Sequence, residues 1–252
     1  MQRRCRIGWM ALLAAALLLA PGCRKKDPDI VGGKKGAMTD EEQIRRGYAD
    51  DEWRKGQNAL EKGNKDTAIG HFEHARRLDP TEPAYPLAAG QVYLEQNNLD
   101  KAETALDASL RALRAIRPEN PADAAMYRKI QAELYLAVGD LLQKKGFVSE
   151  AINAYQSSVE ADPGMARAQF ELGNLFLKRN RYAAAEGRFR EALKADPSML
   201  RAQVGLIQAY HAGGENARAW KEIQDLEKKG YSVHDGLRES VLNAIKNQRH
   251  SG

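Results

Sequence analysis

One block of residues occurs twice in this chain with the same internal spacing, and this repetition constrains the fold more than any other feature. The block consists of a glycine, an alanine, a phenylalanine, a second alanine and a proline. It stands at Gly56, Ala68, Phe72, Ala75 and Pro80, and again at Gly173, Ala185, Phe189, Ala192 and Pro197. Such repetition indicates a stack of similar units, each of which buries its apolar face against its neighbours.

The spacing inside the block fits a unit of two antiparallel helices, A and B. A glycine at place 8 and an alanine at place 20 of the unit allow the two helices to approach closely, and a large side chain such as Phe72 or Phe189 fills the space beside them. The proline ends helix B because it lacks a backbone N–H. We therefore interpret the small residues as structural and not catalytic.

The pattern resembles the tetratricopeptide repeat family, whose unit of 34 residues carries Trp, Leu, Gly, Tyr, Ala, Phe, Ala and Pro at fixed places. Five repeats fit within residues 39–231, and they start at residues 49, 83, 132, 166 and 200. The fifth is degenerate, because Ile207 replaces the glycine and Tyr231 replaces the proline. The resemblance implies an all-α fold, a superhelical solenoid of antiparallel helix pairs.

An insertion of 15 residues, near residues 114–131, separates the second repeat from the third. A helical apolar stripe runs past the usual end of helix B to Ile116, and residues 117–121 then break it. The next helix A is extended backwards by Met126. We predict a hairpin of two elongated helices, in which either Met126 and Tyr127 contact a partner or the two helices only pack on each other.

Both ends of the array carry helix signals. Thr39 and Glu42 form a capping-box pattern, so a helix is expected to begin near Asp40. Residues 232–252 are expected to hold a C-terminal capping helix with Asp235 as its N-cap. This helix either seals the apolar end of the array or is a second binding helix.

Residues 1–22 combine three arginines with an apolar run, which is typical of an export signal. The residues that follow resemble a bacterial lipobox, which implies cleavage before Cys23 and lipidation of that cysteine. Ordinary cleavage after Gly22 is the alternative. Residues 23–38, rich in glycine and basic side chains, are expected to form a flexible tether beside acidic lipid headgroups.

The charge of the rest of the chain argues against nucleic acid as a partner. After residue 36 the sequence holds 31 Lys and Arg and 32 Asp and Glu, so the body is nearly neutral. It therefore lacks the positive surface that binding to phosphate polymers requires. Because Cys5 leaves with the signal, no second cysteine remains to pair with Cys23.

The family resemblance also implies a binding surface, since in this family the A helices line a concave groove. Places 2, 5, 9 and 12 of each repeat point into that groove. The predicted groove residues are Trp53, Gln57, Leu60, Leu87, Gln91, Leu94, Leu136, Asp140, Phe170, Asn174, Leu177, Val204, Gln208 and His211. Amides at place 9 are suited to a peptide backbone, and apolar neighbours are suited to anchoring side chains. Alternatively, the residues at places 5 and 12 are partly buried between helices.

Residue patterns for catalysis or metal binding are weak. His71 and His74 have a spacing that metal ligands use, but no cysteine, third histidine or obvious carboxylate partner accompanies them, so a solvated surface is expected. The sequence has no phosphate-binding loop, nucleophile elbow or metalloprotease motif. We expect no enzymatic activity, no cofactor, no metal and no small-molecule substrate.

These features predict a bacterial tetratricopeptide repeat lipoprotein. Cys23 would anchor it in the outer membrane, with the repeats on the periplasmic face, where they bind one or more envelope proteins as a scaffold or adaptor. Arg24, in place of an aspartate after the lipidated cysteine, favours the outer membrane by resemblance. Two alternatives stay open: a pilotin-like assembly factor for a type IV pilus or secretion pore, and a periplasmic holdase chaperone.

Overall fold

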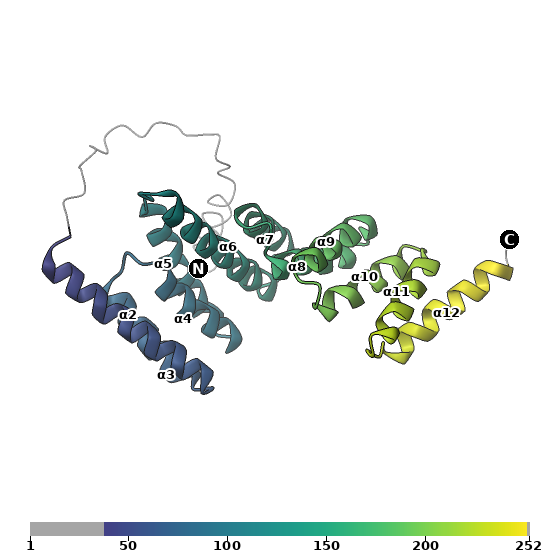
Figure 1. The fold of residues 1–252 in the computed structure, drawn as a ribbon, viewed down its shortest axis with the longest axis horizontal. Helices are drawn as coiled ribbons and strands as arrows, with labels where there is room; N and C mark the ends of the chain where they lie inside the picture. Colours follow the sequence, from purple (N-terminus) through teal and green to yellow (C-terminus); the bar gives the residue numbers. More distant parts are fainter. Residues whose placement is uncertain (1–37, 251–252) are drawn as a thin grey trace, which may run out of the picture. The chain divides into compact units, whose positions relative to one another are not determined.

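The computed structural model describes residues 38–250, which form eleven helices and no strand (Figure 1). Successive helices fold back on each other in pairs, so the predicted all-α repeat architecture is confirmed. The helices are α2 (Asp40–Glu61), α3 (Lys65–Leu78), α4 (Ala84–Glu95), α5 (Leu99–Ala115), α6 (Pro121–Lys144), α7 (Val148–Ala161), α8 (Ala166–Lys178), α9 (Tyr182–Ala195), α10 (Leu200–Ala212), α11 (Asn216–Lys228) and α12 (Asp235–His250).

The described residues belong to two compact bodies. The N-terminal body extends to Ser157 and contains α2 to α6 and most of α7, and the C-terminal body begins at Ser158 and contains α8 to α12. In the N-terminal body, α2, α4 and α6 are the A helices of the first three repeats. In the C-terminal body, α8 and α10 are the A helices of the fourth and fifth repeats, and each packs against the helix that follows it.

Every repeat turns from helix A to helix B through one residue with a left-handed backbone, always at place 15. The φ angles are +76° at Gly63, +57° at Asn97, +85° at Gly146, +55° at Asn180 and +82° at Gly214. Glycine adopts this conformation without a Cβ clash, and asparagine is one of the few other residues that tolerate it. The tight turn therefore depends on glycine or asparagine at a single place.

Close packing of helix A on helix B depends on the glycine at place 8. A Cβ atom on Gly56 would lie 2.5 Å from the ring of Phe72, and one on Gly173 would lie 2.6 Å from the ring of Phe189. The alanine at place 20, Ala68 in the first repeat, is fully buried. The steric interpretation of the repeated small residues is thus confirmed, because a large helix B side chain lies directly on the backbone of helix A.

The fifth repeat uses a glycine at a different place. Ile207, at place 8, is fully buried, as is Ile223 on α11. Gly205, two places earlier, faces the ring of Phe189 on α9, and a Cβ added to it would lie 2.6 Å from that ring. Phe189 is therefore in close contact with two glycines, Gly173 of its own repeat and Gly205 of the next.

The insertion forms the predicted hairpin. α5 and α6 have 17 and 24 residues, whereas α3 and α9, the B helices of the first and fourth repeats, have 14 each. Asn120 is the N-cap of α6, and its side chain accepts a hydrogen bond from the backbone N–H of Asp123 at 2.9 Å. Pro121 was expected to belong to the break, but it is the first residue of α6, a position where its missing N–H has no helical partner to lose.

α2 begins at Asp40, as predicted from its capping box. The backbone N–H of Glu42 donates to the Thr39 hydroxyl at 3.2 Å, and the backbone N–H of Thr39 donates to the Glu42 carboxylate at 2.9 Å. The first two turns of this helix precede the first repeat. They carry Ile44 and Tyr48, whose exposed fractions are 60% and 62%, so these turns are not part of the core.

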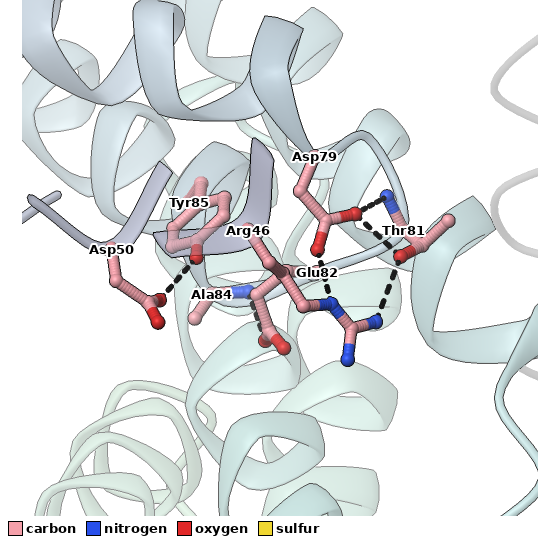
Figure 2. Close-up of polar contacts among 7 residues, drawn as sticks. All are labelled: Arg46, Asp50, Asp79, Thr81, Glu82, Ala84 and Tyr85. Atoms are coloured by element: carbon pink, nitrogen blue, oxygen red, sulfur yellow. Dashed lines mark hydrogen bonds and ion pairs between the residues drawn. The ribbon is translucent and has the colours of Figure 1, made fainter. Parts of the chain in front are cut away.

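A polar joint connects α2 to the α3–α4 turn and to the start of α4 (Figure 2). Arg46 Nε donates to Asp79 Oδ2 at 2.9 Å, Thr81 donates its backbone N–H to Asp79 Oδ1 at 3.0 Å, and the Tyr85 hydroxyl donates to Asp50 at 2.6 Å. Burial raises the pKa of Asp79, but the hydrogen bonds from Thr81 and Arg46 outweigh it, so the pKa is lowered. The joint fixes the first repeat against the second.

α12 packs on α11 and closes the C-terminal body. Val241, in the middle of α12, is fully buried, and Ser240 beside it lies 2.8 Å from Nε2 of His211 on α10. The predicted capping helix is confirmed, but the prediction that Asp235 is its N-cap was wrong. Asp235 is the first helical residue, and the preceding His234 accepts a hydrogen bond from the backbone N–H two residues further on.

Candidate protein-binding surfaces

The predicted groove residues lie on the A helices, but three of them belong to the core of the N-terminal body. Leu87, Leu94 and Leu136 have exposed fractions of 3%, 5% and 6%. α4, which carries the first two, packs against α3, α5 and α6. The expectation that these three leucines contact a partner is therefore corrected in favour of burial between helices.

Four side-chain amides at place 9 are available for hydrogen bonds. Gln57 and Gln91 are exposed on α2 and α4, Asn174 is half-buried on α8, and Gln208 is exposed on α10. Among residues 38–250, none of these amides has a hydrogen-bond partner. Each therefore has a donor and an acceptor that a bound polypeptide backbone would satisfy.

Asp140, the acidic residue at place 9, is already engaged. Its carboxylate accepts a hydrogen bond from the Tyr155 hydroxyl at 2.8 Å, and the same hydroxyl lies 2.9 Å from the side-chain oxygen of Gln143. Tyr155 is the large helix B side chain of the third repeat and is fully buried. Asp140 thus holds helix A to helix B in this repeat.

In the C-terminal body, five of the predicted residues form what we call the α8–α10 face. The two helices contact each other, and the face consists of Phe170, Asn174, Leu177, Val204 and Gln208. All are half-buried except Gln208, which is exposed. The ring of Phe170 is supported by the core, because its centroid lies 6.0 Å from that of Phe189. The face therefore combines three apolar side chains, of which Phe170 is supported by the core, with two unpaired amides.

His211 was predicted to be a groove residue, but both of its ring nitrogens are engaged elsewhere. Nδ1 lies 2.6 Å from Oδ1 of Asn216, and Nε2 lies 2.8 Å from the hydroxyl of Ser240 on α12. Asn216 is itself buried. His211 therefore connects α10 to α11 and to the capping helix, and it has no ring nitrogen left for a partner.

On α2, the predicted contacts Trp53 and Leu60 are half-buried. Trp53 packs against a buried cluster of Ala49, Ala75 and Tyr85. Its indole nitrogen is buried and has no hydrogen-bond partner in the described part of the chain. Trp53 is consequently a core residue on one side, and only part of its ring is available to a partner.

The expectation that His71 and His74 lack a carboxylate partner was wrong. Glu52, on the neighbouring helix α2, lies 2.8 Å from Nδ1 of His71 and 3.2 Å from Nδ1 of His74. Lys55 donates to the same carboxylate at 2.6 Å, and the hydrogen bonds from Lys55 and His71 hold the pKa of Glu52 at about 2. Within residues 38–250, no group of three side chains is arranged to hold a metal ion.

The hairpin tip shows features of both predicted alternatives. α5 and α6 pack on each other, as in the structural interpretation. Met126 is 47% exposed, and Tyr127 is half-buried and lines a pocket between the two helices. This pocket was not predicted from the sequence. Its signal was a second stripe at helical spacing on α6, formed by Ala124, Gln131 and Tyr135.

The predictions for the N-terminus lie outside the described residues. They concern the signal at 1–22, the lipidated Cys23 and nearly all of the tether at 23–38. Among the helices of the described segment, none combines the length and apolar character that crossing a bilayer requires.

This chain is similar to known proteins in both sequence pattern and fold. Residues 54–121, 136–187 and 170–230 match a family model described as Tetratricopeptide repeat. Among solved structures, pilF of Pseudomonas aeruginosa is similar, with a TM-score of 0.63 and 16% identity over 82% of this chain and 93% of that chain. MamA has a TM-score of 0.56 and 20% identity, over 74% of this chain and 97% of its own. YrrB, described as a TPR protein with an unusual peptide-binding site, has a TM-score of 0.53 and 17% identity, over 77% and 90%.

Proposed function

Because this chain belongs to the tetratricopeptide repeat family of protein-interaction repeats, we propose that it is a scaffold whose α8–α10 face binds an extended or helical segment of a protein partner. The observation that carries the proposal is the pair of unpaired amides, Asn174 and Gln208, on neighbouring A helices beside Phe170 and Leu177. Two amides hydrogen-bond to the partner's backbone, and the apolar side chains exclude water around those bonds.

The fold itself supports this proposal. A solved structure of similar fold is described as having a peptide-binding site, although at 17% identity the likeness extends to the fold alone. Phe170 is held in place by Phe189, so binding does not have to order a mobile aromatic ring. A surface that is ordered before binding loses less conformational entropy when a partner binds.

We also propose that the scaffold is a lipoprotein anchored through Cys23 on the periplasmic face of the outer membrane. The support is the sequence alone: an arginine-flanked apolar segment, the lipobox-like residues before Cys23, and a basic, glycine-rich tether. A tether of this kind keeps the repeats close to the membrane while leaving them free to rotate. Partners would then be envelope proteins.

The binding proposal is tested with an Asn174→Ala, Gln208→Ala double variant. Partners captured from envelope extracts by the wild-type protein are identified, purified and titrated against each form. Loss of two hydrogen bonds, at roughly 0.5–1.5 kcal/mol each, should weaken binding by about 5-fold to 150-fold. The matched control is Gln224→Ala, an exposed amide on α11 that makes no hydrogen bond among the described residues and should bind as the wild type does. Equal affinity of all three forms would exclude the α8–α10 face.

The anchoring proposal has a separate test. In a bacterial host, a Cys23→Ser variant should move from the outer-membrane fraction to the soluble periplasmic fraction. Metabolic labelling with an alkyne fatty acid should mark only the form with cysteine. An unlabelled protein that is released after ordinary signal cleavage would overturn the lipid anchor and leave the scaffold proposal intact.

The purified protein, its identified partner and the Cys23→Ser variant also distinguish the scaffold from a holdase chaperone and from a pore-assembly factor. A holdase chaperone would bind many unfolded chains with similar weak affinity, so titration with reduced, unfolded lactalbumin should compete with the identified partner. A pore-assembly factor would need its anchor to deliver its client, so the Cys23→Ser form would bind the client but leave it out of the outer membrane. A scaffold for soluble envelope enzymes would show neither effect.

A further inference from the structure

The inserted hairpin contains a pocket of about 340 Å³ between α5 and α6. Its lining includes Leu113 on α5 and Ile116 directly after that helix, together with Tyr127, Arg128 and Tyr135 on α6. The volume is at the lower end of the range for ligand sites and is sufficient for one or two large apolar side chains. All these residues belong to the N-terminal body, so the pocket is formed within one compact body.

Three polar side chains that line this pocket have donors with no acceptor among the described residues. In the described part of the chain, the hydroxyls of Tyr127 and Tyr135 make no hydrogen bond. Arg128 donates from Nε to the backbone oxygen of Ala124 at 3.3 Å, and its terminal nitrogens have no carboxylate partner among residues 38–250. That bond orients the guanidinium along α6, so its remaining donors are available at the pocket.

The hairpin is also positively charged, unlike the rest of the body. Residues 107–131 carry five cations, Arg111, Arg114, Arg117, Arg128 and Lys129. The same stretch has three carboxylates, Asp107, Glu119 and Asp123, and Asp107 already pairs with Arg111 at 3.1 Å. After residue 36 the whole chain has one more anion than cations, so this local excess of two cations is a property of the insertion.

We propose that the α5–α6 pocket is a second protein-binding site, which takes an apolar side chain flanked by acidic residues in an unstructured segment of a partner. The apolar side chain enters between Leu113 and Ile116. Neighbouring carboxylates accept hydrogen bonds from Arg128 and from the hydroxyl of Tyr135. Burial of the apolar group supplies affinity, and the charge pairs select acidic segments over basic ones. This second site rests on the proposed function in one respect only, namely that the partner is a protein.

A peptide fits these observations better than nucleic acid does. Binding to a phosphate polymer depends on many cations spread along a surface, whereas here the cations are confined to one hairpin on a nearly neutral body. A pocket that admits one or two side chains matches the apolar anchor of a peptide motif. Anionic lipid is the competing occupant, and the test below includes it.

The test uses the mature protein and fluorescein-labelled peptides, with binding followed by fluorescence anisotropy. The two probe peptides have the sequences Gly-Asp-Asp-Leu-Asp-Asp-Gly and Gly-Asp-Asp-Phe-Asp-Asp-Gly. Matched peptides replace every aspartate by lysine, or the central residue by glycine. At least one acidic peptide should bind saturably, the lysine and glycine forms should bind at least about tenfold more weakly, and added salt should weaken the binding.

Two variants locate the site. Arg128→Glu reverses the charge, and Ala124→Phe fills the pocket from the α6 side; each should weaken acidic-peptide binding by about tenfold or more. The charge control is Arg77→Glu, an exposed arginine on α3 with no ion pair among the described residues, which should leave binding unchanged. Circular dichroism and thermal unfolding of each variant establish that it is folded.

The outcomes separate this proposal from the function proposed above. The Asn174→Ala, Gln208→Ala double variant should bind the acidic peptides as the wild type does, because those residues lie in the other body. The pocket proposal is overturned if neither acidic peptide binds, if the lysine forms bind equally well, or if Arg128→Glu and Ala124→Phe have no effect. It is also overturned if vesicles of phosphatidylglycerol bind through Arg128 while the peptides do not.

Discussion

Replacing Gly173 by alanine should destabilise the C-terminal body, although alanine is the better helix former. The added Cβ would lie 2.6 Å from Cε1 and 2.7 Å from Cδ1 of Phe189, distances at which something must shift. The ring of Phe189 is fully buried, and Gly205 on α10 approaches it equally closely. Because the ring lies between both glycines, it cannot move away from the new Cβ without approaching Gly205. The helices themselves must therefore shift to remove the clash.

The size of the effect follows from two opposing terms. Alanine in place of glycine inside a helix gains about 0.5–1 kcal/mol, and an extra methyl group in a packed core costs about 1–3 kcal/mol. The net change should be a loss of about 1–2 kcal/mol. Gly187→Ala on α9 is the matched control, because a Cβ at that residue meets no atom within 4 Å. It should stabilise the protein by about 0.5–1 kcal/mol.

Trp220 on α11 provides the assay. It is half-buried, and the guanidinium of Arg238 lies 5.7 Å from its ring, so its fluorescence reports unfolding of the C-terminal body. Trp53→Phe removes the competing signal from α2. Urea unfolding should rank Gly187→Ala above wild type and Gly173→Ala below it. If Gly173→Ala is as stable as Gly187→Ala, the close contact with Phe189 does not limit the packing, and the steric account of place 8 fails.

Three further predictions concern the turns and the polar contacts. Gly146→Ala should lower the free energy of unfolding by about 1 kcal/mol in urea titrations, because φ at this residue is +85°. Hydrogen bonds from Lys55 and His71 hold the pKa of Glu52 at about 2, below its ordinary value, so the stability it adds is complete above pH 4.5 and is lost as the pH falls toward 2. Glu52→Gln should therefore differ most from wild type in thermal melts above pH 4.5 and least near pH 2. Tyr210→Phe should cost about 1 kcal/mol by chemical unfolding, because the buried hydroxyl lies 2.7 and 2.8 Å from nitrogens of two arginines.

The helix pairs were predictable because most repeats pack helix A on helix B with the same residue types at the same places. Gly56 and Phe72 stand at fixed places, and their contact follows from the helical period. The left-handed turn was harder to predict, since asparagine takes the place of glycine at Asn97 and Asn180. Because both residue types tolerate a positive φ, the backbone angles of the five repeats identify the turn residue, whereas its residue type alone does not.

The candidate site was less predictable, because exposure at a given place depends on neighbouring helices and not on the repeat alone. Leu87 and Phe170 share place 5, yet Leu87 is core and Phe170 is half-buried on the α8–α10 face. Likewise, Glu52 meets His71 and His74 only because α2 and α3 fold together. Such contacts between helices have no signature in one sequence when the partners are ordinary surface residues.

Segments that depart from the 34-residue period are the ones whose surface can distinguish this chain from other tetratricopeptide repeat proteins. Residues that recur, such as the glycine of place 8, are determined by packing and leave little freedom for recognition. The α5–α6 pocket lies where 15 residues interrupt the period, so its walls are not required to match another repeat. The place 9 amides on α8 and α10 lie on a shared surface, which suits contacts with a polypeptide backbone of any sequence. It follows that the α8–α10 face should set affinity for a range of partners, while substitutions in the hairpin should change which partner is chosen.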